Sequence, residues 1–557
     1  MQPRRALEWG ALTTAIALAA PYCFDAIGET DAGFHIAVGR LILRSGIPRT
    51  NALSWIARDA PWYPNSWLFD VVCAAVTDRF GLLGLQLFTF LLAVAVLALV
   101  AQLLRIGEPG RGVLLLPALA LLLGPRLRPR PHLVSWVAIA AVLLLCLLAR
   151  DRGRRWRWAA VPVVALAGNL HAGAAFAAAV AAIFFLDEWL RTRDARELAG
   201  AGAAALSLLA NPGGLYDLRY LAAHLRVQEV MPLREFGPPG WPASAFFFFA
   251  VPAALFIALW RPREHRPLLA LAVIFAALAM RAARMQFEFL IVAAPLLAEG
   301  LGMIAAAGPR APALCALGAA CVAMVQTGYP QLLGVLDVGP KFDAAVLPVR
   351  AARYVREAGL DGPHFNSFDD GGFLAYALPA LPVFVDGRVQ AYPESLFARL
   401  RSAEGSPSAF DAFLREIGAG WALVQRRSAL VTGNELLDRL PGWALVYWDD
   451  INEIFVRRDV QRWSSLVAAD EFRWLRPDDP GLQRIASAAS QELPKARAEV
   501  ERFERFSPQD SYAAVARCAV AARSGAPGAV CAAALARADY PALRALAQRV
   551  AELPPAP

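Results

Sequence analysis

The sequence predicts a polytopic α-helical membrane protein that carries a C-terminal α/β domain and a helical tail. Of the 557 residues, 57% are hydrophobic and only 18% are charged, whereas soluble chains carry about 25% charged residues. The apolar residues are concentrated in runs before residue 330, and several runs reach the roughly 20 residues that a membrane-spanning helix needs. Short Arg-rich segments separate these runs. Together these features predict a bundle of membrane helices.

The apolar runs predict about eleven transmembrane helices. They cover residues 7–24, 82–104, 113–124, 133–149, 159–168, 172–190, 198–210, 245–260, 268–280, 287–307 and 313–327. Because Lys and Arg in short loops stay on the cytoplasmic side, Arg4 and Arg5 place the N-terminus in the cytoplasm and the odd number of spans places the C-terminus in the periplasm. The run at 7–24 is interpreted as an uncleaved first helix, since the residues after it form a poor signal-peptide cleavage site. The basic loops account for the net charge of +8, so nucleic-acid binding is not expected.

Three domains follow from this pattern. Residues 1–330 form the transmembrane domain, with a first periplasmic loop at 25–80 whose residues 67–80 are expected to form an interfacial helix. Residues 331–460 form a periplasmic α/β domain, because short strand patterns alternate with helical ones. The strands are expected at 364–368, 382–386, 421–425, 443–448 and 454–457.

Residues 461–557 are rich in Ala, Arg, Glu and Leu, which predicts a helical tail. Helices at 511–522, 529–538 and 543–553 suggest a tetratricopeptide-like array, although no clean repeat is present. Cys518 and Cys531 can form a disulfide if this tail is periplasmic.

Four polar clusters follow apolar runs on the expected periplasmic side, and several of these runs hold only about 10–14 residues. The clusters comprise Arg126, Arg128, Arg130 and His132; Asn169 and His171; Asn211 and Pro212; and Arg281 and Arg284. Polar groups at membrane depth are tolerated where they line a cavity. A one-turn spacing should put Arg281 and Arg284 on one helix face. We therefore predict a recessed, cationic periplasmic cavity, with ordinary turn residues as the alternative.

The first periplasmic segment holds the acidic candidates. Asp31 and His35 are four residues apart, so a helix that begins near Asp31 would stack them on one face. The alternative is that Asp31 only caps this helix. Trp55, Trp62, Tyr63 and Trp67 follow, as in an aromatic belt or a sugar-stacking surface.

Several short motifs occur in order along most of the chain. They are Asp31-Ala32-Gly33-Phe34-His35 with Gly39-Arg40, residues 62–67, residues 167–173, residues 211–215, and Val385-Asp386-Gly387-Arg388. With the acidic residue after helix one and the long first external loop, the chain resembles the GT-C superfamily of membrane glycosyltransferases and a related set of uncharacterised bacterial membrane proteins. The resemblance extends from helix one to about residue 458.

The resemblance implies an enzyme of the bacterial inner membrane, embedded in membrane lipids, that moves a sugar from a polyprenyl-phosphate donor to a periplasm-facing glycan, lipid or protein. Its first-loop carboxylate falls on Asp31, with Glu29 as the alternate and His35 nearby, and would act as general base. The leaving lipid phosphate requires cationic or hydrogen-bonding partners. The candidates are Arg281, Arg284, Arg128, Arg130, His132, His171 and Asn169.

Cofactor and acceptor sites are less defined. A divalent cation, Mg²⁺ or Mn²⁺, held by Asp31, Glu29 and His35 stays open. No second acidic pair with metal-like spacing follows in a later external loop, which departs from the GT-C pattern. The turn at residues 368–372 is faintly similar to the Trp-Trp-Asp acceptor motif of oligosaccharyltransferases but lacks both tryptophans. The acceptor-binding candidates are Asp369, Asp370, Asp386 and Arg388, with an ordinary turn as the alternative.

Two other classes of function stay open. Arg and Asn at membrane depth also occur in transporters, but the chain has no evident inverted repeat of the kind that many transporters carry. A non-catalytic membrane scaffold with a periplasmic binding domain is the third class.

Overall fold

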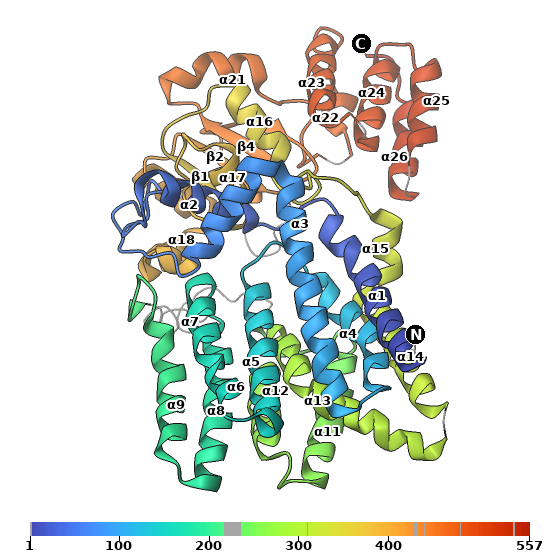
Figure 1. The fold of residues 1–557 in the computed structure, drawn as a ribbon. Coiled ribbons are helices and arrows are strands. Elements are labelled where there is room, and N and C mark those ends of the chain that lie inside the picture. The colour runs from blue at the N-terminus through green and yellow to red at the C-terminus, as the bar shows by residue number, and fades with distance from the viewer. Residues whose placement is uncertain are drawn as a thin grey trace. The chain divides into compact units, whose positions relative to one another are not determined.

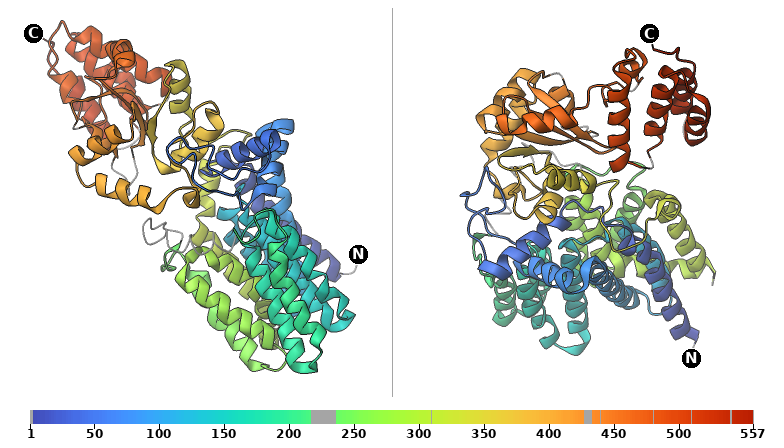
Figure 2. Two further views of the ribbon diagram at one scale, coloured as in Figure 1. Left: turned by 90° about the vertical axis from the view of Figure 1, so that its left-hand side faces the viewer. Right: turned by 90° about the horizontal axis from the view of Figure 1, so that it is seen from above.

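The computed structural model of the protein describes residues 3–216, 236–308, 310–426, 433–438, 440–479, 481–508, 510–538 and 541–556. The chain forms two compact units (Figures 1 and 2). The first comprises Met1–Thr50, Pro61–Phe342 and Val389–Ala391, and the second comprises Asn51–Ala60, Asp343–Arg388 and Tyr392–Pro557.

The described secondary-structure elements of the first unit are all helices, and the long ones run along one another (Figure 1). Its elements are α1 (Pro3–Phe24), α2 (Ala32–Ser45), α3 (Trp67–Gly107), η1 (Gly112–Leu115), α4 (Leu116–Leu123), η2 (Gly124–Arg126), α5 (His132–Arg152), α6 (Arg155–Trp158), α7 (Ala160–Leu170), α8 (Ala174–Thr192), α9 (Ala195–Leu206), η3 (Ser207–Leu209), α11 (Ala245–Trp260), α12 (Arg266–Arg281), η5 (Ala283–Met285), α13 (Gln286–Ile304), η6 (Ala305–Ala307), α14 (Ala311–Thr327) and α15 (Tyr329–Val335).

Each of the eleven predicted apolar segments contains a helix, but their number as membrane spans stays a prediction. Among the described residues, three helical segments are long and apolar enough to cross a membrane: α3, α5 and Ala283–Ala307; the bent pair of α14 and α15 makes a fourth if it is one span. Most of the other apolar helices are shorter than these segments; α4, for example, has eight residues. At 1.5 Å per residue such helices cannot cross a hydrocarbon core of about 30 Å by themselves.

The helices predicted at 67–80 and 82–104 are confirmed as the two parts of α3, whereas the interfacial position of the first stays a prediction. Gly81 has φ of 66° and ψ of −164° inside this helix and kinks it after Phe80. A positive φ suits glycine because it lacks a Cβ atom. The predicted helix of the first loop is confirmed as α2, which packs closely on α3, since a Cβ at Gly39 would lie 1.9 Å from the Asp70 carbonyl oxygen.

The second unit contains a four-stranded sheet with the order β1-β2-β4-β3. β1 is parallel to β2, and the β2–β4 and β4–β3 pairs are antiparallel. The elements are α16 (Val349–Glu357), β1 (His364–Asn366), α17 (Phe368–Ala377), α18 (Glu394–Ala403), α19 (Pro407–Glu416), β2 (Trp421–Gln425), α20 (Gly433–Asp438), β3 (Trp443–Trp448), β4 (Asn452–Arg457), η8 (Gln461–Trp463), α21 (Ser464–Asp470), α22 (Gln483–Ala486), α23 (Leu493–Phe506), α24 (Ser511–Arg523), α25 (Gly528–Arg537) and α26 (Pro541–Ala551), while η7 (Val389–Ala391) is grouped with the first unit.

Four of the five predicted strands are confirmed, and the prediction of a strand at 382–386 is wrong. Val383 makes only an isolated bridge to Ser54. The Asn366 side chain replaces a neighbouring strand, since its Oδ1 accepts from Phe384 N (2.8 Å) and its Nδ2 donates to Val385 O (2.8 Å). Because the Asn366 side chain makes these hydrogen bonds, the two backbone groups do not need partners on a neighbouring strand.

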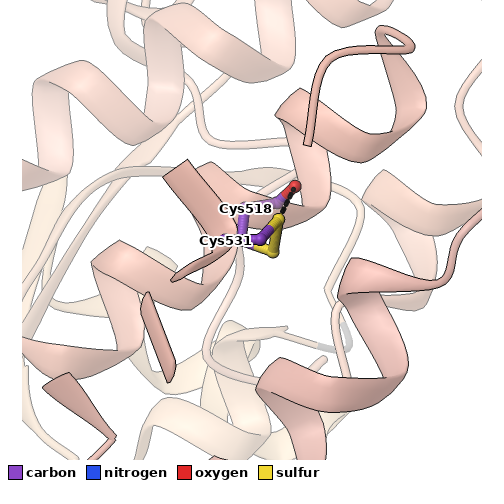
Figure 3. Close-up of a disulfide and its surroundings, with 2 residues drawn as sticks. All are labelled: Cys518 and Cys531. Atoms are coloured by element: carbon purple, nitrogen blue, oxygen red, sulfur yellow. Dashed lines mark hydrogen bonds between the residues drawn. A yellow bond between two sulfur atoms is a disulfide. The ribbon is translucent and has the colours of Figure 1, made fainter. Parts of the chain in front are cut away.

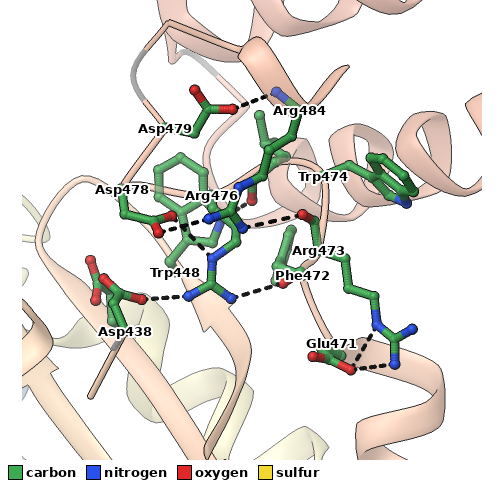
Figure 4. Close-up of polar contacts among 12 residues, drawn as sticks. Asp438, Trp448, Glu471, Phe472, Arg473, Trp474, Arg476, Asp478, Asp479 and Arg484 are labelled. Atoms are coloured by element: carbon green, nitrogen blue, oxygen red, sulfur yellow. Dashed lines mark hydrogen bonds and ion pairs between the residues drawn. The ribbon is translucent and has the colours of Figure 1, made fainter. Parts of the chain in front are cut away.

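The helical tail is confirmed as α23–α26 (Figure 2), whereas the tetratricopeptide-like arrangement stays a prediction. Cys518 of α24 and Cys531 of α25 form a disulfide (Figure 3). Ion pairs hold the segment before the tail: Arg476 contacts Asp438 (2.6 Å) and Asp478 (3.0 Å), and Arg484 also contacts Asp478 (2.9 Å; Figure 4).

The buried Glu499 carboxylate attaches α23 to this segment. It accepts hydrogen bonds from three successive backbone N–H groups, of Arg473 (2.9 Å), Trp474 (2.8 Å) and Leu475 (2.9 Å). We expect Glu499→Gln to destabilise the second unit by about 1–3 kcal/mol, because an amide oxygen cannot replace a charged acceptor of three bonds. Thermal unfolding of the purified protein measures this. Glu501→Gln removes only an exposed pair with Arg497 and should change stability by less than about 0.5 kcal/mol; equal effects would contradict the assigned role.

Candidate active site

The segment that follows α1 is fixed by hydrogen bonds to a distant part of the first unit. Ala26 N donates to Asp337 O (2.9 Å), and Ile27 N donates to Lys341 O (2.8 Å). Gln86 of α3 donates to the carbonyl oxygens of Asp25 and Gly339, both at 2.9 Å. The segment that follows α1 is therefore held in place immediately before Glu29 and Asp31.

Glu29 and Asp31, here called the acidic pair, share one guanidinium partner. Arg130 Nε lies 2.6 Å from Glu29 Oε1, and Arg130 Nη2 lies 2.8 Å from Asp31 Oδ2. The Asp31 side chain is 24% exposed and that of Glu29 8%, so Asp31 is the more accessible carboxylate. Within the described residues, Asp31 makes no side-chain capping bond to α2. The alternative that Asp31 serves only as a helix cap is therefore not supported.

His35 lies one turn after Asp31 on α2, as predicted, but its ring bonds with a residue that the sequence did not single out. His35 Nδ1 lies 2.6 Å from Asp70 Oδ1, and Ser66 Oγ donates to the same oxygen (3.1 Å). All three residues are buried. The pair connects the start of α2 to the first turn of α3 and so fixes the helix that carries Asp31. No local spacing could reveal it, because 35 residues separate its members.

The proposed divalent-cation set does not fit this arrangement. Glu29 and Asp31 are both ion-paired with Arg130, and His35 Nδ1 is bonded with Asp70. Among the residues that the structure describes, no group of three or more His, Cys, Asp and Glu could hold a metal ion. We therefore derive no step through a metal.

A basic cluster surrounds His132 at the start of α5. The charges of Arg126, Arg130 and Arg284 all act on the His132 ring, and His171 is also close. His132 Nε2 hydrogen-bonds with Arg126 O (2.9 Å). Several cations that come from separate segments thus gather beside the acidic pair, and we call Arg126, Arg130, Arg284, His132 and His171 the basic cluster.

His171 is oriented by two bonds to its Nδ1 atom. Gly173 N donates to it (3.2 Å), and Ser135 Oγ lies 2.7 Å from it. Because the backbone N–H is a donor, Nδ1 is an acceptor and the ring proton of neutral His171 is on Nε2.

Glu288 is a functional candidate that the sequence analysis missed. It is buried in the first turn of α13, where its Oε1 accepts from Trp136 Nε1 (3.1 Å) and the charges of Arg284 and Arg126 act on it. The signal was an acidic residue inside an apolar run, which is costly in a membrane and marks functional positions.

The expectation that Arg281 and Arg284 share one helix face is wrong. Arg281 ends α12 and is exposed, whereas Ala282 is extended (φ −138°, ψ 110°) and Arg284 belongs to the short helix η5. Arg284 lies over the Phe236 ring, 4.7 Å from its centroid. The break after Arg281 therefore separates the two guanidinium groups, and the second contributes to the basic cluster.

Arg128 and Asn169 occupy different surroundings from those of the basic cluster. Arg128 is exposed and, with Glu29, lines a small cavity of about 30 Å³. Asn169 accepts from Trp67 Nε1 (3.0 Å) and donates to the carbonyl oxygens of Ala165 (2.9 Å) and Ala210 (2.8 Å). The structure thus gives Asn169 a part in joining α7 to α3. Trp62 and Tyr63 are each 2% exposed, so they do not form an open stacking surface.

The acceptor candidates all lie in the second unit, and only Asp369 is exposed. Asp386 and Arg388 are buried and bond with each other, with Nη2 2.6 Å from Oδ2. Asp370 is buried at the start of α17 and accepts from Gln425 Nε2 and Asn452 Nδ2, both at 2.9 Å. Three of the four candidates are thus enclosed in this unit.

Burial raises the pKa of the Asp370 carboxyl to about 8. Since the unfolded chain releases this proton near pH ~4, the native state binds more protons between these values and stability should fall as pH rises through the interval. Asp370→Asn should remove this slope and raise the melting temperature of the second unit at pH 8 but not at pH 4. Asp369→Asn, at the exposed neighbouring position, should keep the slope. Melting curves across pH test this, and a full slope in the Asp370 variant would contradict the assignment.

No protein-family model and no curated protein matches the chain, but solved structures do. The oligosaccharyltransferase AglB of Archaeoglobus fulgidus, bound to an inhibitory peptide and a dolichol-phosphate, matches with a TM-score of 0.53 and 12% identity over 76% of this chain and 70% of that one. The same organism's oligosaccharyltransferase tethered to an acceptor peptide gives a TM-score of 0.53 and 11% identity over 75% and 69%.

ArnT of Cupriavidus metallidurans bound to undecaprenyl phosphate matches more loosely, with a TM-score of 0.47 and 15% identity over 81% of this chain and 97% of that one. The two matches with a TM-score above 0.5 are thus structures of an archaeal oligosaccharyltransferase. At this level of identity the match shows a likeness in fold alone: about three quarters of the chain share the fold of these two structures.

Proposed function

We propose that the chain is an inner-membrane glycosyltransferase that moves a sugar from a polyprenyl-phosphate donor to a glycan, lipid or protein acceptor at the periplasmic face. The observation that carries this proposal is the acidic pair after α1, ion-paired with Arg130 beside the basic cluster. A carboxylate and a group of cations are what an acceptor hydroxyl and a departing phosphate require.

In the proposed reaction, the Asp31 carboxylate takes the proton of the acceptor hydroxyl as its oxygen attacks the anomeric carbon. The new carbon–oxygen bond forms while the bond from the anomeric carbon to the phosphate oxygen breaks, and polyprenyl phosphate leaves with the bonding electrons. Arg284 and Arg126, with His132 and His171, stabilise the negative charge on the phosphate.

Arg130 has two roles in this proposal. Without donor it is ion-paired with both carboxylates, and with donor it turns toward the phosphate, which frees Asp31 to accept a proton. Glu29 keeps Arg130 close, because the Nε–Oε1 contact (2.6 Å) does not involve Asp31.

The proposed orientation places the N-terminus in the cytoplasm and the second unit, including the helical tail, in the periplasm. The Arg-rich loops support it through the positive-inside rule. The bond between Cys518 and Cys531 is in keeping with it, since disulfides persist in oxidising compartments.

The test uses the full-length protein in liposomes with a panel of polyprenyl-phosphate hexoses and pentoses, together with an envelope extract as the acceptor source. Release of free polyprenyl phosphate from at least one donor, dependent on the protein, is the expected result. No release from any donor, with donor binding also absent, would overturn the proposal.

A further inference from the structure

An apolar groove of about 460 Å³ lies between α11, α13 and α14, close to α4. Small residues, among them Ala253, Gly300 and Ala319, leave room for it. Phe249 and Phe256 line it and are 63% and 56% exposed, so the groove is open along the outside of the helices. Its volume is roughly three times that of an apolar cavity that holds benzene.

The groove has the length of one membrane leaflet. On α11 its lining extends from Phe246 to Ile257, which at 1.5 Å per residue is about 16 Å. Half of the hydrocarbon core is about 15 Å. A single lipid chain that enters from one membrane surface would therefore fill it.

Exposed arginines lie at one end of the segments that line the groove. Arg261 directly follows α11, Arg310 directly precedes α14, and Arg111 directly precedes η1. Glu264 accompanies Arg261 at 3.5 Å, and both are exposed. α14 packs against both η1 and α11, so the three arginines lie at the same end of the groove. They outnumber the two carboxylates there, Glu264 and Glu108, the latter beside Gly302 of α13.

We propose that this groove binds an anionic phospholipid, with one acyl chain between α11, α13 and α14 and the headgroup phosphate among Arg111, Arg261 and Arg310. The acyl chains of the bilayer are as apolar as the groove, so moving a chain into it does not discriminate between lipids with different headgroups. The headgroup charge therefore decides the selection, since each Lys or Arg near a membrane surface favours anionic lipid. The proposal does not depend on sugar transfer.

The main rival occupant is a chain longer than one leaflet, such as a polyprenyl tail. A second hollow of about 510 Å³, lined by residues that include Pro242, Ala245 and Val325, shares Val322 with the groove and continues it toward the other end of α14. A polyprenyl chain would occupy both hollows and would not require the arginines.

The test measures lipid binding to the purified full-length protein by native mass spectrometry. Phosphatidylglycerol and phosphatidylcholine with identical chains are titrated in mild detergent. We expect phosphatidylglycerol to bind at least about fivefold more tightly. The double variant Arg261→Gln, Arg310→Gln should lose most of this preference. Equal affinity of the two lipids for the unmodified protein would overturn the proposal.

Two adjacent positions on α14 provide a matched control. Ala319 lines the groove, whereas Gly318 is exposed and has no atom within 4 Å of a Cβ built on it. Ala319→Phe should lower phosphatidylglycerol occupancy at least fivefold, and Gly318→Phe should not change it. Ala253→Phe fills the groove from α11 if the first variant does not fold. Unchanged binding in a folded groove variant, or competitive displacement of phosphatidylglycerol by polyprenyl phosphate, would refute the proposed occupant.

Discussion

Asp31→Asn is expected to lower the rate of sugar transfer by about 10²–10⁴-fold while donor binding stays nearly unchanged. The amide keeps the size of the side chain but cannot accept the acceptor proton, and loss of a general base has an effect of this size. Stability should change little, because the ion pair that the substitution removes is part exposed, with Asp31 at 24% and Arg130 at 21%, and such pairs contribute about 0–1 kcal/mol. Release of polyprenyl phosphate under single-turnover conditions measures the rate.

Asp78→Asn is the matched control for this experiment. Asp78 of α3 is also ion-paired with an arginine, Arg40 of α2, at 2.6 Å. Its pair connects α2 to α3 and lies outside the acidic pair and the basic cluster. A loss of transfer in both variants would indicate that packing of α2 on α3 is responsible. Full activity of Asp31→Asn would show that Asp31 is not the general base.

Glu29→Gln distinguishes the role of the Glu29 carboxylate from that of Asp31. Since Glu29 holds Arg130 through Nε, the variant should weaken donor binding and slow transfer moderately, by less than Asp31→Asn. If Glu29→Gln is the inactive variant and Asp31→Asn is active, the base is Glu29 and the enzyme class survives. If both variants transfer sugar at the parental rate, neither carboxylate is the base and the proposed mechanism is wrong.

The helices could be predicted from the sequence because their signal is local. An apolar run between Arg-rich turns identifies a membrane helix without knowledge of its neighbours, and the observed bounds of α5, α11 and α14 differ from the predicted ones by three residues or fewer. The boundary between the helices predicted at 67–80 and 82–104 falls at Gly81, where α3 is kinked.

The contacts within the candidate site could not be predicted, because they join residues that are far apart in the chain. Arg130 meets Glu29 and Asp31 across about a hundred residues, and His35 meets Asp70 across α2 and α3. Sequence patterns report periodicity and composition but not which side chains meet. The wrong prediction of a strand at 382–386 has the same cause. The Asn366 side chain makes hydrogen bonds with this segment, and β-propensity carries no information about such distant partners.

Arg284→Ala is expected to weaken binding of polyprenyl phosphate by about 1.5–3 kcal/mol, which is roughly 10–150-fold, since hydrogen bonds to charged groups contribute this much. Arg284 acts electrostatically on His132 and on Glu288, so its removal also leaves the buried Glu288 with less compensation. Arg284→Lys should recover only part of the affinity, because the ammonium group lacks the planar fork of the guanidinium. Titration of labelled polyprenyl phosphate measures the affinities.

Arg281→Ala decides how far the donor site extends. Arg281 is exposed at the end of α12, on the other side of the extended residue Ala282. A loss of affinity in both single variants would assign both guanidinium groups to the phosphate, as the sequence pattern suggests. A loss at Arg284 alone would confine the donor site to the basic cluster. Parental affinity in the double alanine variant would return both residues to a structural role, and the phosphate would then have to be held by Arg126 and Arg130, the other two arginines around His132.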